Sequence, residues 1–372
     1  MRKILLLTNM YPSGKAPSYG IFVKKTYQWL HELYQVRLIK IFKNEKIIKK
    51  IYAYFIFYLK AIFQGVFSQY DCVYAHFISH CALPIRIIRF FHKNIVIVGN
   101  IHGEDVFSEY EKYQKNKKRA RIFLKYCNYI IAPSSYFKDK LCEEYGFDEK
   151  RVFVSPSGGV DTNYFIPKSN NQCRQRFGFN ISKKYIGMVS RIEEGKGWDV
   201  FIKAAKMIEY DNIEFLIVGS GSQEPEMKKL IEQEGMWDRI ILLPMMGHDK
   251  LPDIYNSLDI FCFPTNRVGE SLGLVGLEAM SCKIPCVISS MPGPSSYCSH
   301  DNCLRFEPKD AYQLSIKIKE LLDMDSDHLM RMKENARETA LKYDSRLVKQ
   351  DFLKFFERII QIYTNEVTEN DT

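Results

Sequence analysis

The sequence predicts an α/β protein with two doubly wound parallel sheets. Short apolar runs typical of buried strands alternate with helical patterns along the whole chain. The alternation restarts after a polar, turn-rich stretch at Asn163 to Asn180, which predicts a seam between two domains. A chain of 372 residues, 46% of them hydrophobic, is also long and apolar enough to bury two ordinary cores.

The elements follow one another in two series. The N-terminal apolar run is too short for a signal peptide and is typical of a buried parallel strand. The first series of predicted strands comprises residues 4–7, 36–42, 72–75, 95–99, 129–132 and 152–154. The second series comprises residues 185–189, 215–218, 240–243, 260–263 and 286–289, and helices are predicted over 314–322 and 347–364.

The predicted domains are residues 1–165 and 166–345, followed by a helix over 346–365 and a polar tail over 366–372. Ligands of open α/β sheets bind outside the carboxyl ends of the strands. Two such domains facing each other form a cleft, and the polar motifs of this chain should line it because each follows a predicted strand.

Charge is unevenly distributed along the chain. The formal net charge is +9, but residues 1–168 hold 27 basic and 13 acidic residues (net +14), whereas residues 169–372 hold 26 and 31 (net −5). This asymmetry indicates an anionic partner for the first half: a nucleic acid, a membrane surface or a phosphorylated acceptor. The ten cysteines form no CxxC pair, which argues against a metal site and suggests the cytosol.

The longest apolar stretch, residues 51–67, is interrupted by Lys60 and Gln64, so we expect a soluble or peripheral protein rather than a membrane-spanning one. On a helical projection of residues 46–66, one side carries Lys46, Lys49, Lys50, Lys60 and Gln64 and the opposite side is apolar, an arrangement that suits anionic lipid. The alternative is an ordinary surface helix that covers the sheet. A second basic stretch contains Lys112, Lys115, Lys117, Lys118, Arg119, Arg121 and Lys125. No recognisable RNA- or DNA-binding module accompanies either stretch.

Glu270 and Glu278 flank a glycine-bearing apolar segment after the predicted strand at 260–263. A helix beginning near Gly273 would present free backbone N–H groups, around Leu274 and Val275, beside the first carboxylate. Such a helix end suits phosphate, and the carboxylates suit sugar hydroxyls, so the layout matches a nucleotide sugar. The simpler interpretation is that the spacing of the two glutamates is accidental and that an acidic residue near the helix N-terminus only interacts favourably with the helix dipole.

Two further motifs also follow strands. Arg191 and Lys196 lie in a turn with two glycines, and a planar guanidinium and a compact ammonium suit the oxygens of a diphosphate. The alternative is a solvated turn with two basic residues. His102 stands in a His-Gly-Glu-Asp sequence after the strand at 95–99 and can donate to a sugar or steady the reacting centre, although a lone histidine is more often structural.

These motifs, in this order, resemble those of the GT-B glycosyltransferases of glycosyltransferase family 4 over nearly the whole chain. Glu270 and Glu278 match the ends of the family's E-x(7)-E motif, Arg191 to Gly197 matches R-x(4)-K-G, and His102 to Asp105 matches H-G-x-D. Ser157 to Asp161 resembles the N-G-V-D hinge, with Ser-Gly where Asn-Gly is commoner. The resemblance implies a GT-B fold: two Rossmann-like domains facing across a cleft, with a C-terminal helix that crosses back to the first domain.

The resemblance also implies roles for individual residues. Arg191 and Lys196 would neutralise the donor diphosphate, Glu278 would bind the ribose and Glu270 the transferred sugar. With His102, the residues Arg191, Lys196 and Glu270 form the predicted catalytic group. The predicted donor-binding residues are Gly20, Gly219, Gly273, Leu274, Val275 and Glu278.

The implied reaction is metal-independent, anomer-retaining transfer of a hexosyl or N-acetylhexosaminyl group from a UDP-sugar, with no cofactor. Asp323-Met324-Asp325 and Asp325-Ser326-Asp327 match a metal-binding Asp-x-Asp pattern, but their place after a helix predicts turn and N-cap roles. The expected acceptor is a saccharide, lipid-linked and used for cell-surface polysaccharide, at the inner face of a bacterial membrane. The alternatives are a sugar-nucleotide epimerase, an inverting transferase, and a non-enzymatic nucleotide-sugar- or nucleic-acid-binding protein.

Overall fold

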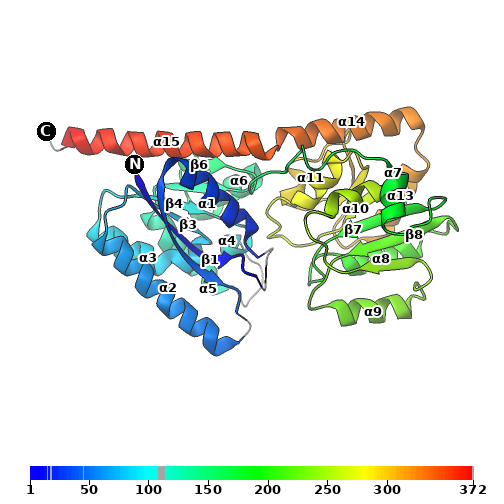
Figure 1. Cartoon of the computed structure of the whole chain (residues 1–372), viewed down its shortest axis with the longest axis horizontal. Coiled ribbons are helices and arrows are strands. Elements are labelled where there is room, and N and C mark those ends of the chain that lie inside the picture. The colour runs from blue at the N-terminus through cyan, green and yellow to red at the C-terminus, as the bar shows by residue number, and fades with distance from the viewer. Residues whose placement is uncertain (15, 17–18, 45, 108–113, 371–372) are drawn as a thin grey trace. The chain divides into compact units, whose positions relative to one another are not determined.

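The computed structural model describes residues 1–14, 16, 19–44, 46–107 and 114–370. Contacts divide the chain into two compact units (Figure 1): unit 1 is Met1–Gly158 with Leu347–Thr372, and unit 2 is Gly159–Arg346. Each unit contains a six-stranded sheet in which every recorded strand pair is parallel. The predicted doubly wound α/β class with two Rossmann-like domains is therefore confirmed.

Unit 1 contains a sheet with the strand order β2-β1-β3-β4-β5-β6, so the winding direction changes between β1 and β3. Its strands are β1 (Lys3–Tyr11), β2 (Gln35–Phe42), β3 (Cys72–His76), β4 (Val96–Asn100), β5 (Tyr129–Ala132) and β6 (Val152–Val154). Its helices are α1 (Ile21–Leu33), α2 (Ile47–Phe67), α3 (Ile78–Phe91), α4 (Glu104–Phe107), α5 (Gln114–Tyr126), α6 (Ser135–Tyr145) and the short 3₁₀ helix η2 (Glu149–Arg151).

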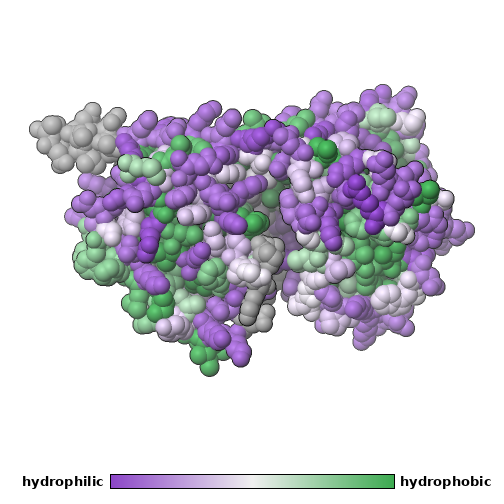
Figure 2. All heavy atoms as spheres, in the orientation of Figure 1, coloured by the Kyte–Doolittle hydropathy of each residue, from purple (hydrophilic) through white to green (hydrophobic). Residues whose placement is uncertain are grey.

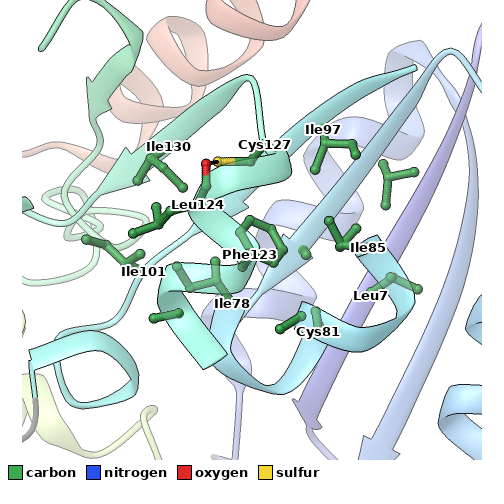
Figure 3. Close-up of a cluster of buried hydrophobic side chains, with 14 of the residues drawn as sticks. Leu7, Ile78, Cys81, Ile85, Ile97, Ile101, Phe123, Leu124, Cys127 and Ile130 are labelled. Atoms are coloured by element: carbon green, nitrogen blue, oxygen red, sulfur yellow. Dashed lines mark hydrogen bonds between the residues drawn. The ribbon is translucent and has the colours of Figure 1, made fainter. Parts of the chain in front are cut away.

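Alternate side chains of the unit 1 strands enter two different cores, as the two-residue period of a strand requires. Leu5 and Leu7 face a cluster with α2, α3 and α5, part of which Figure 3 shows around Phe123 and Ile85. Ile4 and Leu6 face a second cluster with α1 and with α15 (Ser345–Asn370). The C-terminal helix thus covers one face of the first sheet.

Helix α2 exposes much of its apolar surface, contrary to the expectation for an ordinary helix covering a sheet. The residues that pack inward are Phe57, Ala61 and Gly65. An added Cβ at Gly65 would lie 2.3 Å from Ile88 Cδ1, so this small residue lets α2 approach α3 closely. The outward side carries a row of large hydrophobic side chains, seen as green patches at the lower left of Figure 2: Ile47, Ile48, Ile51, Tyr52, Phe55, Leu59, Phe63 and Phe67.

Unit 2 has the strand order β12-β11-β10-β7-β8-β9, and its winding direction changes between β7 and β10. The strands are β7 (Lys184–Val189), β8 (Ile213–Val218), β9 (Ile240–Leu243), β10 (Ile260–Phe263), β11 (Cys286–Ser289) and β12 (Leu304–Phe306). The sequence analysis missed β12, because its three residues, Leu304–Phe306, are too few to establish a period. Every other strand was predicted to within two or so residues, apart from the longer β1.

The helices of unit 2 lie on both faces of its sheet. One buried cluster joins the strands to α8, α9 and α13, and the other joins them to α10, α11 and α14. Asp310 and Asp325 cap α13 and α14 by accepting hydrogen bonds from backbone N–H groups. The helices are α7 (Asn170–Arg176), α8 (Trp198–Lys206), α9 (Glu224–Gln233), α10 (Leu251–Ser257), α11 (Leu274–Ser281), α12 (Pro292–Ser295), α13 (Ala311–Leu322) and α14 (Ser326–Lys342).

The boundary between the units lies earlier than the predicted 165/166. Residues after Gly158 already belong to unit 2, because Val160 pairs with Asp344 and Phe165 enters the core. The Arg337 guanidinium donates to the backbone carbonyls of Thr162 and Phe165 and so ties this segment to α14.

The C-terminal helix is longer than predicted. Helix α15 begins at Ser345 and continues to Asn370, through most of the expected tail at 366–372. No proline or glycine occurs there to end it. In the part of the chain that the structure describes, no helix is both long and apolar enough to cross a bilayer.

Candidate functional site

The carboxyl ends of β7 and β10 lie at the point where the winding of unit 2 reverses, which is where open α/β sheets bind ligands. The segment from Ser190 to Gly197 follows β7 and leads into α8. The segment from Pro264 to Gly273 follows β10 and leads into α11. Neighbouring strands thus bring together two of the segments that the sequence analysis selected.

Lys196 and Glu270 come from these two segments and form an ion pair. Their side chains are only 11% and 14% exposed. Thr265 lies within hydrogen-bonding distance of the same Glu270 carboxylate, with Oγ1 3.1 Å from Oε2. The pair therefore has a fixed geometry, close to the surface at the end of the sheet.

The electrostatic surroundings keep Glu270 ionised. Burial by itself would raise the pKa of this carboxyl, but the Lys196 ammonium and the hydrogen bonds from Lys196 and Thr265, helped by the Arg267 charge, hold the pKa below its usual range. A carboxylate that stays charged in a sheltered position accepts hydrogen bonds strongly, including those from vicinal hydroxyls.

Glycines shape the segment that carries Lys196. Gly195 and Gly197 both have left-handed backbone conformations, with φ of +79° and +76°. A Cβ at Gly197 would lie 1.9 Å from the Pro264 carbonyl oxygen, and Gly195 accepts a hydrogen bond from the Asn266 N–H at 2.9 Å. The glycines therefore allow this segment to pack against the segment after β10.

Helix α11 begins directly after Gly273, whose φ is +77°. Its first N–H groups, including those of Leu274 and Val275, have no partner inside the helix because of their position in the first turn. The Tyr297 hydroxyl donates to the Gly273 carbonyl at 3.0 Å. These contacts fix the start of α11 where the sequence analysis placed it.

Glu278 lies in the second turn of α11. The Tyr255 hydroxyl, from the buried helix α10, donates to Glu278 Oε2 at 2.8 Å. Burial, together with the charge of Glu278, raises the pKa of Tyr255 far above its usual value, so this hydroxyl keeps its proton and can donate. Tyr255 thereby orients Glu278, the residue predicted to bind the ribose.

The remaining predicted residues of unit 2 lie in the same region but differ in character. Arg191 is exposed, unlike Lys196. Gly219, at the end of β8, has a φ of +153°, and a Cβ there would lie 1.7 Å from the Ser190 carbonyl oxygen. The structure therefore gives a packing reason for glycine at 219, in addition to the predicted role in donor binding.

His102 and Gly20 belong to unit 1. Gly20 precedes α1 with a φ of +78°, and its Cβ would lie 2.8 Å from the Met10 carbonyl oxygen. Phe22, in the first turn of α1, contacts the His102 ring with centroids 4.8 Å apart. Pro17 and Ser18, which shortly precede Gly20, lie outside the described residues, as does Lys112 of the second basic stretch.

Asp105, the last residue of the H-G-x-D motif, holds the His102 segment. Its carboxyl accepts hydrogen bonds from the backbone N–H groups of His102 and Ile78, at 2.8 and 3.1 Å. Burial raises the pKa of Asp105 to about 7 even though these two donors act in the opposite direction. The Asp of this motif is therefore a support for the histidine.

Several residues of this region were missed by the sequence analysis. Thr265 and Tyr255 bind the two glutamates, and Tyr297 supports Gly273. In unit 1, His76 hydrogen-bonds His102. No local motif marks Tyr255, Tyr297 or His76, because each acts on a residue from another element. Thr265 contacts Glu270 within the same irregular segment after β10.

The two Asp-x-Asp matches have the structural role that was predicted. Asp325 caps α14 by accepting from the His328 N–H at 3.0 Å, and Asp323 ends α13. Among the described residues, no three His, Cys, Asp or Glu side chains are grouped so as to hold a metal ion.

Two family models match the chain. The model described as Glycosyltransferase Family 4 matches residues 12–164, and the model described as Glycosyl transferases group 1 matches residues 169–339. The chain is a family 4 glycosyltransferase. The matched regions contain strands β2 to β12 and all of the predicted site residues.

Curated relatives align with only part of this glycosyltransferase. The D-inositol 3-phosphate glycosyltransferase of Mycolicibacterium smegmatis is 29% identical over 44% of this chain and 38% of its own length. Mannosylfructose-phosphate synthase of Agrobacterium fabrum is 26% identical over 50% of this chain and 42% of its own length. The aligned segments thus span less than half of these relatives.

Solved structures agree with the GT-B fold of the glycosyltransferase. Sucrose-phosphate synthase from Thermosynechococcus elongatus has a TM-score of 0.79 at 17% identity, covering 97% of this chain and 100% of that one. Anabaena HepE in complex with UDP has a TM-score of 0.76 at 18% identity, covering 96% and 100%. At this identity the likeness concerns the fold.

Proposed function

We propose that this glycosyltransferase moves a hexosyl or N-acetylhexosaminyl group from a UDP-sugar to a saccharide acceptor, with retention of the anomeric configuration. The observation that carries the proposal is the sheltered Lys196–Glu270 pair at the switch point of unit 2, beside the start of α11. It joins a diphosphate-binding cation to a hydroxyl-binding anion. The solved complex of HepE with UDP and glucose is a compatible precedent on the same fold.

Each residue has a chemical task in this proposal. The Lys196 ammonium, the Arg191 guanidinium and the first N–H groups of α11 stabilise the charge that develops on the leaving diphosphate. Glu278, oriented by Tyr255, accepts hydrogen bonds from the ribose, and Glu270 accepts them from the transferred sugar. These groups perform the task of a divalent cation, so we propose transfer without a metal.

The bond changes follow from retention. The bond between the anomeric carbon and the diphosphate oxygen breaks, and the bond to the acceptor oxygen forms on the same face of the sugar. The acceptor's proton passes to an oxygen of the departing diphosphate. An epimerase or an inverting transferase would need a different arrangement of base and acceptor.

We expect a UDP-sugar to raise the melting temperature in a panel of UDP- and GDP-sugars, because a donor that binds the native state stabilises it by mass action. The same donor should then give a product whose anomeric configuration, read by NMR, equals that of the donor. Activity should persist in EDTA. An inverted product, or activity lost in EDTA and restored by manganese, would contradict the respective parts of the proposal.

The acceptor that we propose is lipid-linked, used for cell-surface polysaccharide and met at the inner face of the membrane. The support is α2, which exposes Ile47, Ile51 and Phe55 by 74%, 66% and 57% beside the exposed Lys49 and Lys50. A groove of about 1280 Å³ lies between α2 and the edge strand β2. Neither α2 nor β2 contains an acidic residue, so both suit an anionic amphiphile.

Liposome flotation is expected to show binding to anionic but not to zwitterionic vesicles, weakening with salt. Lys49→Glu with Lys50→Glu should abolish it, because the change reverses the charge beside the exposed apolar row. Lys228→Glu with Lys229→Glu is the matched control, since these two lysines are exposed on α9 in unit 2. Equal loss in both double variants, or binding to RNA instead of vesicles, would point away from a membrane.

A further inference from the structure

A chain of hydrogen bonds runs through unit 1 and ends at the His102 ring. Thr26, on α1, lies with its Oγ1 3.1 Å from Nε2 of His76. His76, at the end of β3 and fully buried, places its Nδ1 3.0 Å from Nε2 of His102. The two imidazole rings are nearly parallel, with an interplanar angle of 12°.

The direction of the protons follows from the first member of the chain. Thr26 Oγ1 lies 3.0 Å from the Val23 carbonyl oxygen, which can only accept, so the single hydroxyl proton points to Val23. The Thr26 oxygen must therefore accept from His76 Nε2–H. A neutral imidazole has one N–H, so His76 Nδ1 carries a lone pair and must accept from His102 Nε2–H.

The groups around this chain are consistent with that direction. The Tyr74 hydroxyl accepts from Asn100 Nδ2 at 2.7 Å, and Thr26 Oγ1 has lone pairs with which to accept from His76. The Asp105 carboxyl binds the His102 backbone N–H, not the ring. Each of the two hydrogen bonds that join Thr26, His76 and His102 then has one donor and one acceptor.

Burial keeps both rings neutral, as this argument requires. It lowers the pKa of His102 to about 3. Burial, together with repulsion by His102, also lowers the pKa of His76 well below its usual value. Phe22 and Phe77 cover the His102 ring, with centroids 4.8 and 4.3 Å from its own. A charged imidazolium that donates from both nitrogens is therefore excluded at neutral pH.

We infer that Thr26 and His76 are positioning residues that hold His102 with Nε2 protonated and with Nδ1 as a hydrogen-bond acceptor. His102 then accepts a hydrogen bond from a hydroxyl group of the sugar substrate, which reverses the donor role expected from the sequence. The choice of hydroxyl as partner rests on the proposed function. The tautomer itself does not depend on it.

The test is the tautomeric state of His102, read by long-range ¹H–¹⁵N correlation of histidine-labelled protein without substrate. The His102 signals are assigned by their absence in His102→Gln. The wild type is expected to show an unprotonated Nδ1 and a protonated Nε2. Because this spectrum requires no turnover, it tests the tautomer of His102 independently of the proposed transferase reaction.

Thr26→Val is the decisive variant, because it keeps the side-chain shape and removes the acceptor for His76. His76 should then turn its proton toward His102, so His102 shifts to the Nδ1-protonated tautomer and turnover falls by about tenfold. The UDP-induced thermal shift should be unchanged. Thr8→Val, which removes a buried hydroxyl of unit 1 that bonds Met10 instead, should leave the tautomer as in the wild type.

Two results would overturn the inference: a protonated Nδ1 on His102 of the wild type, or an unchanged tautomer in Thr26→Val. The wild-type spectrum decides the matter even if Thr26→Val fails to fold. Failure of every nucleotide sugar to react, with the expected spectrum, would refute the transferase proposal and leave the histidine tautomer established.

Discussion

Lys196→Met is expected to lower turnover by roughly 10² to 10³, because the variant loses one positioned cation for the developing diphosphate charge. It should also lower the free energy of unfolding by about 2–3 kcal/mol, because Glu270 is left as a sheltered, unpaired carboxylate. This second effect should shrink as the pH falls. Without Lys196, burial raises the pKa of Glu270, and the carboxyl can take up a proton.

A double-mutant cycle separates the two effects. Glu270→Gln in the Lys196→Met background should restore much of the stability, since no buried charge then lacks a partner, while turnover stays low. Lys203→Met is the matched control, because Lys203 is exposed on α8. If Lys196→Met kept wild-type turnover, Lys196 would have no role in the reaction. Melting curves and initial rates on the same samples are sufficient measurements.

Gly197→Ala is expected to destabilise unit 2 by about 3 kcal/mol or more. The new Cβ would meet the Pro264 carbonyl oxygen at 1.9 Å, and neither backbone segment can move without separating the two halves of the site. An alanine at a φ of +76° adds about 1–2 kcal/mol of backbone strain. Turnover should fall as well, because the displaced segment carries Lys196.

Gly178→Ala separates the cost of backbone strain from the cost of the steric clash with Pro264. Gly178 has a similar φ of +70°, but a Cβ added there has no neighbour within 4 Å. Its variant should therefore lose only the backbone contribution, about 1–2 kcal/mol, and keep full activity. Denaturant unfolding of both variants provides the comparison. Equal losses would mean that the approach of Gly197 to Pro264 does not matter.

The sequence was sufficient to predict the fold because its signals are local. The apolar runs of parallel strands, the turn glycines and the start of α11 at Gly273 can all be read within a few residues. The order of the strands at the switch points also follows from the fold class. This is why the sequence predicts a single site for Lys196 and Glu270, which are 74 positions apart and form an ion pair in the structure.

The burial and the partners of the site residues could not be predicted, because they depend on contacts between elements far apart in the sequence. The sequence analysis assigned the same role to Arg191 and Lys196. In the structure Arg191 is exposed, whereas Lys196 is paired with Glu270 and mostly buried. It could not find Tyr255 or His76, since each is an ordinary core residue until its partner is known. The inward side of α2 was missed because Ala61 and Gly65 pack through their small size rather than through hydrophobicity.

Helix α15 has a consequence for the order in which the molecule is completed. Phe352 and Phe356, close to the end of the chain, pack on Tyr74 in the core of unit 1. A ribosome synthesises these phenylalanines only after every residue of unit 2. Unit 1 can therefore complete this core only after unit 2 has been translated, although most of its own residues are synthesised before those of unit 2.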